Sequence, residues 1–182
     1  MKSTFLSRAL LACAVFSAMS LTPSPAAKAN AKPVARLAAT DARLTKLENL
    51  MLGYVNSARA KAGLKALTLD TTLGEVARAH SAEMRDKNYF AHESPTEALR
   101  DPLDRYVLGI GSTPRLVAEN IFRAWGSRRE IKDSDALRAH NSLMNSPGHK
   151  ANILRDGPTK IGIGFIANDK GDLWVTQMFS RP

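Results

Sequence analysis

The chain has 182 residues and a net charge of +9, and its composition includes a single cysteine, Cys13. One cysteine cannot form an intramolecular disulfide, so stability must come from a hydrophobic core, and the length suits one domain. The basic residues are scattered, with Arg128-Arg129 the only short arginine pair. This distribution does not indicate nucleic-acid binding; it favours anionic cell-wall polymers or lipid head groups, or solubility alone.

Residues 1–29 have the pattern of an export signal. Lys2 and Arg8 form a basic start, residues 9–21 are apolar, and Ala27-Lys28-Ala29 gives the A-x-A order typical of a cleavage site. The apolar run of about 13 residues is shorter than the roughly 20 that span a bilayer, so no stable membrane anchor is expected. Cleavage removes three basic residues and no acid, which lowers the net charge from +9 to +6.

A lipoprotein signal is the alternative, because Leu10-Leu11-Ala12-Cys13 has the order of a bacterial lipoprotein box. Only residues 9–12 would then separate Arg8 from Cys13, which is too short for a hydrophobic region. We therefore expect general secretion to the periplasm or the extracellular space. The mature chain would contain no cysteine.

Residues 30–40 are expected to form a flexible leader, and residues 41–182 a single domain. Apolar residues at helical spacing, with Asp, Thr or Pro at the start and Gly or Pro at the end, predict four helices. These are residues 41–62, 70–88, 101–109 and 134–145. The stretch between the last two is expected to be long and irregular, and Pro147 to block continuation of the fourth helix.

The last part of the chain changes to a strand pattern. Residues 160–167 and 172–179 are predicted strands, and the turn residues 168–171 join them as a hairpin. Gly162 and Gly164 in the first strand indicate that another element lies close against it. Because the helices come first and the strands last, the expected fold is α+β, with helices packed on a small antiparallel sheet.

Short motifs follow one another in a fixed order along residues 44–181. They are Asn56-Ser57-Ala58-Arg59, Ala77 to Met84, Tyr89-Phe90-Ala91-His92, Asp104-Arg105, Glu119-Asn120-Ile121, Ser146-Pro147-Gly148-His149, Ile161 to Phe165 and Trp174 to Phe179. In this order they resemble the CAP superfamily of cysteine-rich secretory, antigen 5 and pathogenesis-related 1 proteins, and its secreted bacterial SCP-domain members above all. The resemblance implies a three-layer α-β-α sandwich with a surface cleft.

The same resemblance implies that His92, Glu119 and His149 line that cleft. Two imidazoles and a carboxylate suit a divalent transition metal such as zinc, with one coordination position left open. They also suit acid–base chemistry, because histidine titrates near neutrality. The structural alternative is a hydrogen-bonded polar cluster that holds loops together.

The chain departs from the family pattern at a fourth position. Many eukaryotic members carry Trp-x-x-Glu before the second histidine, where this chain has Leu143-Met144-Asn145-Ser146. Bacterial relatives usually keep the tryptophan in W-M-x-S-P-G-H, so Leu143 departs from them as well. Replacement of the acid by Ser146 weakens both tight metal binding and a mechanism that uses two carboxylates. Leu143 is expected to point into the core, one helical turn from Ala139 and His140.

Other polar and aromatic side chains are interpreted mainly as packing residues. His80 is expected on the apolar face of the second helix, with the rim of the cleft as the alternative, and His140 to pack or lie at the surface. Gln177 is placed on the same strand face as Val175 and Phe179. Core positions are expected for Phe90, Trp125, Trp174 and Phe179.

The leading functional hypothesis is a secreted, non-enzymatic module that binds an apolar or cell-wall-derived ligand through the cleft, with a metal as an optional participant. Lipid binding enters only through the family resemblance. The alternative is a peptidase-like, metal-dependent hydrolase that uses His92, Glu119 and His149. A third possibility is an interaction module whose partner contacts the surface between Gly109 and Ser134. A monomer without nucleic acid is expected in each case.

Overall fold

The computed structural model describes residues 41–126 and 130–182, which belong to one compact unit, Ala39–Pro182. The predicted signal peptide, the predicted leader and Cys13 lie outside the described residues. The elements in chain order are α3 (Ala42–Lys61), β1 (Thr68–Leu69), α4 (Thr71–Asp86), η1 (Glu97–Leu99), α5 (Pro102–Ile110), β2 (Leu116–Ala124), α6 (Ser134–Asn145), α7 (Pro147–Ile153), β3 (Lys160–Ala167) and β4 (Leu173–Arg181). No helix within this described part is long and apolar enough to cross a membrane.

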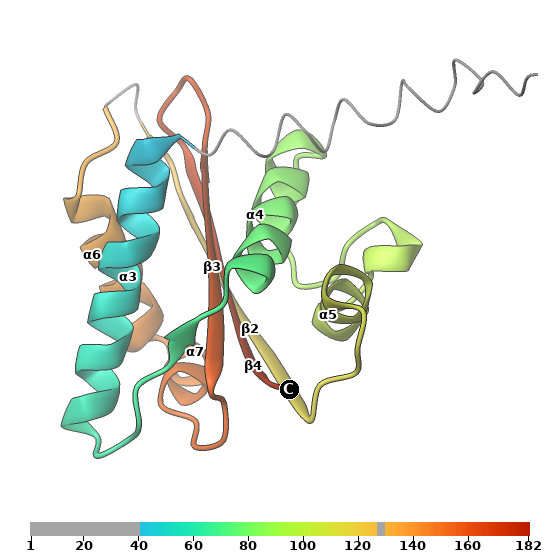
Figure 1. Ribbon diagram of the computed structural model, residues 1–182. Helices are drawn as coiled ribbons and strands as arrows, with labels where there is room; N and C mark the ends of the chain where they lie inside the picture. The colour runs from blue at the N-terminus through green and yellow to red at the C-terminus, as the bar shows by residue number, and fades with distance from the viewer. Residues whose placement is uncertain (1–40, 127–129) are drawn as a thin grey trace, which may run out of the picture. The chain divides into compact units, whose positions relative to one another are not determined.

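A four-stranded sheet forms the middle layer, in the order β1-β3-β4-β2. The predicted hairpin pairs β3 with β4, β2 runs antiparallel to β4 at one edge, and the short β1 runs parallel to β3 at the other. Helices α3, α6 and α7 cover one face of the sheet, and α4 and α5 cover the other (Figure 1). The α+β sandwich is therefore confirmed, with the addition that β1 makes the sheet mixed.

The four predicted helices are all present, and local capping explains where they begin. Asp41 accepts a hydrogen bond from the Arg43 amide at the start of α3, and Asp70 accepts one from the Leu73 amide at the start of α4. Asp101 begins α5 with a capping box. Aspartate at these positions satisfies amide groups that have no partner within the helix.

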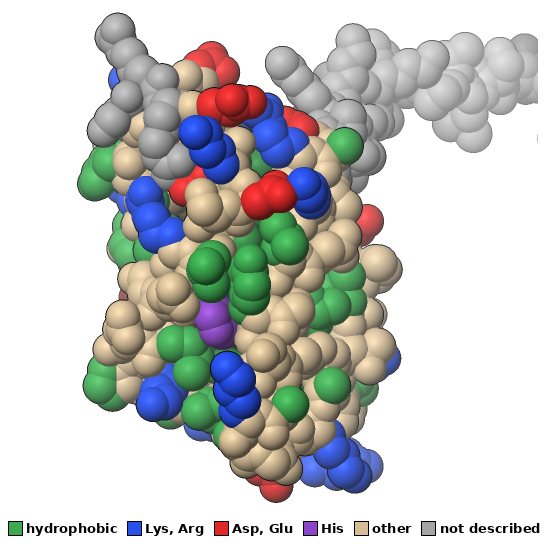
Figure 2. Space-filling view, turned by 90° about the vertical axis from the view of Figure 1, so that its left-hand side faces the viewer, with side chains coloured by type: hydrophobic (Ala, Val, Ile, Leu, Met, Phe, Trp, Pro, Cys, Tyr) green, Lys and Arg blue, Asp and Glu red, His purple; other side chains and the backbone are tan. Residues whose placement is uncertain are grey.

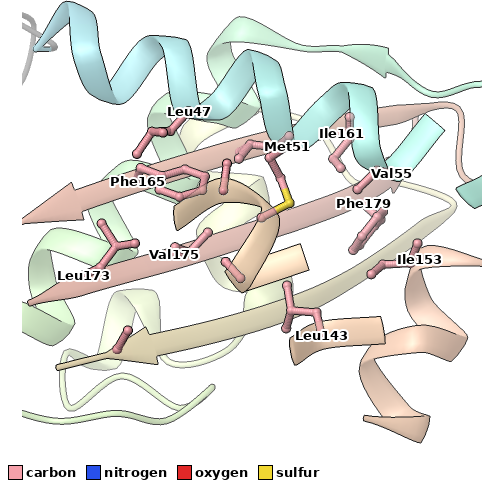
Figure 3. Packing of buried hydrophobic residues seen from close by; sticks show 14 of the residues in the cluster. Leu47, Met51, Val55, Leu143, Ile153, Ile161, Phe165, Leu173, Val175 and Phe179 are labelled. Atoms are coloured by element: carbon pink, nitrogen blue, oxygen red, sulfur yellow. The ribbon is translucent and has the colours of Figure 1, made fainter. Parts of the chain in front are cut away.

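The main core lies between the sheet and the layer of α3, α6 and α7 (Figure 3). Side chains from both sides interlock there, among them Leu47, Met51, Val55, Phe165, Val175 and Phe179. Leu143 of α6 points into this core and is 2% exposed, as the sequence predicts.

On the other face, α4 packs directly on β3. A Cβ atom on Gly164 would lie 2.2 Å from the Arg78 amide nitrogen, and one on Gly162 would lie 2.3 Å from the Leu73 carbonyl carbon. Only glycine permits this approach, so the prediction of a close neighbour against this strand is confirmed. The close contact fixes α4, and the side chains that α4 presents, relative to the sheet.

The outer face of α3 and α6 shows hydrophobic side chains around a histidine, with charged side chains towards the ends (Figure 2). His140 packs between these helices: its ring centroid lies 5.8 Å from that of Tyr54. Burial lowers the pKa of His140. The packing role predicted for His140 therefore holds.

Two expectations about local structure are wrong, and one short helix is not predicted. The stretch expected to be irregular contains β2, whose central Glu119 and Asn120 disguise the strand pattern. Helix α6 ends at Asn145, before Pro147, as predicted. The helix that is not predicted is α7, where Pro147 is the first residue and its missing amide donor costs nothing. Trp125 and Phe90 are exposed, at 67% and 44%, and do not lie in the core.

Candidate functional site

The site is built at β2, the edge strand of the sheet. Glu119 and Asn120 are successive residues of β2, so their side chains point to opposite faces. Glu119 pairs with Met178 and faces the layer of α4 and α5, whereas Asn120 pairs with Gln177 and faces α7. The edge of the sheet is therefore where groups from both layers meet.

The carboxylate of Glu119 is held by two side chains. Arg105 Nη2 donates to Oε2 at 2.7 Å, and His92 Nδ1 lies 2.9 Å from Oε1. The side chains of Arg105 and Glu119 are 2% and 1% exposed. This charge-assisted pair is shielded from water. Because Arg105 holds Oε2, the carboxylate is oriented with Oε1 towards His92 Nδ1.

Arg105 also holds the segment that carries His92. Its Nη2 donates to the backbone carbonyl oxygen of His92 at 3.0 Å, and its Nη1 donates to that of Leu99 at 2.8 Å. One guanidinium thus joins α5 to Glu119 and to both ends of residues 92–99. His92 lies in this segment outside any helix or strand, with 49% of its side chain exposed.

A second anchor of the same segment is Glu83 on α4. Its carboxylate accepts hydrogen bonds from Tyr89 Oη at 2.7 Å, Ser94 Oγ at 2.8 Å and Thr96 Oγ1 at 2.5 Å. Burial raises the pKa of Glu83, but hydrogen bonds from these hydroxyls and from Lys87 outweigh it and lower the pKa to about 2. Burial, together with the bond to Glu83, raises the pKa of Tyr89 to about 12.

His149 reaches the site from the other layer, on α7. Asn120 Nδ2 donates to the backbone carbonyl oxygen of His149 at 3.0 Å and to Gln177 Oε1 at 3.1 Å. Asn152 Nδ2 donates to the Glu119 carbonyl oxygen at 3.2 Å and to Asn120 Oδ1 at 2.9 Å. These amides fasten α7 to the edge of the sheet.

The two histidine rings face one space. The ring centroids of His92 and His149 lie 6.5 Å apart, with 47° between the ring planes. Burial, and then repulsion from His92, lower the pKa of His149. Near neutral pH, His149 therefore presents a neutral imidazole.

His80 lies behind Glu119 and away from the surface. Its Nε2 is 3.7 Å from Glu119 Oε1, outside hydrogen-bond distance, and its Nδ1 is 3.5 Å from Tyr89 Oη. Burial lowers the pKa of His80. Its position on α4 agrees with the predicted packing role, but the sequence alone did not place it against Glu119.

The structure brings His92, Glu119 and His149 together, although only His92 lies in a loop. Glu119 is inside β2 and His149 is inside α7, so a strand and a helix position two of the three side chains directly. The sequence does not predict that Arg105 and Glu83 hold the segment that carries His92. Their sequence signal is weak, since a buried arginine and a buried glutamate look like ordinary surface charges on amphipathic helices.

The residues present fit a three-ligand metal site poorly. In residues 41–126 and 130–182, no group of three or more His, Cys, Asp or Glu side chains is arranged to hold one ion. Glu119 already accepts from Arg105, and that positive charge opposes a cation at the same carboxylate. The arrangement instead makes Glu119 the residue that orients His92. A zinc site at these residues is a hypothesis from the sequence that a binding measurement must test.

Comparison with known proteins places the chain in a family. The model of the cysteine-rich secretory protein family, CAP, matches residues 52–179. The uncharacterized protein YkwD of Bacillus subtilis is 35% identical over 134 residues, which are 74% of this chain and 47% of YkwD. The uncharacterized membrane protein YlbC of the same organism is 30% identical over 121 residues, which are 66% of this chain and 32% of YlbC. The chain thus matches less than half the length of either relative.

Solved structures agree with this assignment. An extracellular protein containing an SCP domain from Bacillus anthracis has 33% identity and a TM-score of 0.59, with 78% of this chain and 41% of that chain covered. An outer surface protein from Borrelia burgdorferi has 20% identity and a TM-score of 0.62, with 73% and 90% covered, and shows a likeness of fold alone. The matched residues include the edge strand, its Glu119 and both cleft histidines, and the chain belongs to the CAP family.

Proposed function

We propose that the protein is exported and that its CAP domain is a non-hydrolytic binding module, which takes a cell-wall-derived ligand between His92 and His149. The observation that carries this proposal is the state of Glu119. Both of its carboxylate oxygens are engaged, one by Arg105 and one by His92. The carboxylate nearest to the cleft is thus used to fix a histidine.

A hydrolase of the expected kind needs a base that reaches a water molecule beside the bond to be cleaved. The Glu119 side chain is 1% exposed, so it is screened from solvent. The acid that many CAP proteins carry at the fourth position is Ser146 in this chain. A two-carboxylate mechanism therefore lacks its usual partner at this position.

The cleft is suited to a polar ligand. With Nδ1 directed at Glu119, His92 offers Nε2 to a ligand, and His149 offers a second, neutral imidazole ring. Sugar hydroxyls and peptide amides of wall polymers supply the hydrogen-bonding groups that such rings contact. This chemistry favours a wall-derived ligand over an apolar one at this cleft.

The export part of the proposal is supported by the signal-like pattern of residues 1–29. It is also supported by the relative at 33% identity, which is described as extracellular. A cell-wall ligand agrees with the expected net charge of +6 after cleavage, because many wall polymers are anionic.

Co-sedimentation with purified peptidoglycan sacculi tests the proposal. We expect the native protein to sediment with sacculi, and the variants His92→Gln and His149→Gln to stay in the supernatant. His140→Gln is the matched control, because it changes a histidine at the α3–α6 contact and should sediment like the native protein. Equal sedimentation of all four proteins would contradict a ligand site at the cleft.

The hydrolase alternative keeps one supporting observation. A histidine oriented by a carboxylate at 2.9 Å is also the geometry of a general base. Mass spectrometry of the supernatant from the same experiment separates the two. Soluble fragments that the native protein releases, and that His92→Gln does not, would replace the binding proposal by the hydrolase.

A further inference from the structure

A pocket of about 160 Å³ opens in the seam between α4 and α5. The surface of the pocket is mostly apolar, although three polar residues contribute to it. It is lined by Val76, Ala79, His80 and Glu83 of α4, Leu99 of η1, and Arg105, Leu108 and Gly109 of α5. Glu119 and His92 do not line it. His80 and Arg105 therefore separate this pocket from the Glu119 carboxylate, and the pocket is distinct from the cleft between His92 and His149.

Helices α4 and α5 are in contact at Gly109 and leave the pocket next to this contact. A Cβ atom on Gly109 would lie 2.2 Å from Val76 Cγ2, so α5 touches α4 directly at that point. The neighbouring Leu108 lines the pocket and is 65% exposed. Leu103 and Val107 of the same helix are also largely exposed. Helix α5 therefore exposes apolar side chains at the pocket and next to it in the sequence.

Two of the lining residues each carry one buried polar atom without a hydrogen-bond partner. His80 Nε2 and Arg105 Nε have no hydrogen-bond partner in the described structure. Both side chains are almost fully buried. The rest of the Arg105 guanidinium is fully used, because it donates to Glu119 and to the backbone of residues 92–100. A change in the pocket thus acts on side chains whose other contacts are in the cleft.

We propose that this seam pocket is a second binding site, which takes a compact apolar molecule or the apolar end of a larger ligand. An apolar cavity of about 150 Å³ is known to accept benzene, so a single ring or a short hydrocarbon chain fits the volume. Burial of such a group against Leu99, Leu108 and Val76 is favourable, because apolar surface leaves water on both partners. The inference does not depend on the ligand proposed for the cleft.

The pocket is connected to the cleft through Arg105 and His80. Arg105 contacts both the Glu119 carboxylate and the His92 backbone, and His80 Nε2 lies 3.7 Å from Glu119 Oε1. A molecule in the pocket contacts both of these side chains. It should therefore change the surroundings of the His92 ring without touching it.

Titration of isotope-labelled protein with benzene, followed by nuclear magnetic resonance, tests the site. We expect saturable shifts in the amide signals of residues 76–83 and 105–109, together with a shift of the His92 ring signal. Ala79→Leu should abolish these shifts by placing a larger side chain in the pocket. Ala60→Leu, an exposed alanine of α3, is the matched control and should respond like the native protein.

Leu108→Ala gives a second, independent variant that removes part of the pocket wall from an exposed position. It should weaken benzene binding about tenfold, which corresponds to about 1.4 kcal/mol. The proposal is overturned if saturating benzene leaves the signals of residues 76–83 and 105–109 unmoved. It is also overturned if folded Ala79→Leu and Leu108→Ala both bind as the native protein does. Binding in the pocket with an unmoved His92 ring would overturn the connection to the cleft.

Discussion

Arg105 and Glu119 form a buried ion pair of 2.7 Å between a helix of one layer and the edge strand of the sheet. The pair joins α5, which is otherwise poorly buried, to the strand that carries the cleft. Because the same guanidinium holds the backbone of His92, the position of the exposed histidine depends on a contact that is not itself exposed.

Removal of one partner of this pair should be strongly destabilising. Arg105→Ala leaves the Glu119 carboxylate buried without its counter-charge, and we expect a loss of roughly 3–5 kcal/mol in the free energy of unfolding. Urea unfolding measures it. The control is Arg43→Ala, which removes an exposed pair with Asp41 and should cost less than about 1 kcal/mol. Equal losses of unfolding free energy in the two variants would contradict a buried ion pair between Arg105 and Glu119.

A second prediction concerns the core beneath α7. Leu143→Ala should cost roughly 2–5 kcal/mol, because it leaves a cavity among side chains of the sheet and α7. Leu137→Ala is the control on the same helix, where the side chain is 41% exposed, and it should change stability by less than about 1 kcal/mol. Denaturant melts that show no difference between the two would contradict the orientation of α6.

Acid sensitivity should depend on Glu83. The pKa of Glu83 is lowered from 4.5 to about 2 in the folded protein. The ionised carboxylate therefore stabilises the fold fully above the pKa of the unfolded chain, and this stabilisation is lost as the pH falls through the pKa of the folded protein. The free energy of unfolding should therefore fall between about pH 5 and pH 2, by an amount on the order of 3 kcal/mol.

Glu83→Gln should flatten this part of the pH profile, whereas Glu97→Gln, on an exposed residue of η1, should leave it as it is in the native protein. Urea melts at several pH values give the comparison. A Glu83→Gln profile as steep as the native one would show that Glu83 is not the group responsible.

Zinc binding is a separate test of the cleft. Since Glu119 is paired with Arg105, we expect isothermal titration calorimetry to detect no binding at micromolar zinc. The variant His149→Ala serves as the comparison. Micromolar binding by the native protein that His149→Ala abolishes would show that the cleft holds a metal despite the engaged carboxylate.

Much of the fold could be predicted because its signals are local. Caps such as Asp70 and the turn residues 168–171 fix element boundaries from neighbouring residues alone. Strand β2 escaped prediction because an edge strand that carries a functional site has polar Glu119 and Asn120 where an apolar alternation is expected. Helix α7 escaped because Pro147 both ends one helix and begins the next.

The candidate site was predictable only in part. His92, Glu119 and His149 were identified from their motifs and through the family resemblance. Their convergence depends on contacts with β2, where Glu119 contacts the His92 ring and Asn120 donates to the backbone of His149. The residues that hold them in place could not be predicted from motifs. Arg105 and Glu83 act through contacts across the fold, and nothing in their sequence neighbourhood distinguishes a buried charge from an exposed one.

The most direct test of the account is a titration of histidine-labelled protein with a soluble peptidoglycan fragment, followed through the ring signals of the histidines. His140, which packs against Tyr54 between α3 and α6, serves as the internal control. The account predicts that the His92 and His149 signals shift together and saturate, that His140 does not move, and that the fragment is recovered intact. Shifts confined to His140, or no shifts at saturating fragment, would contradict a ligand site between His92 and His149.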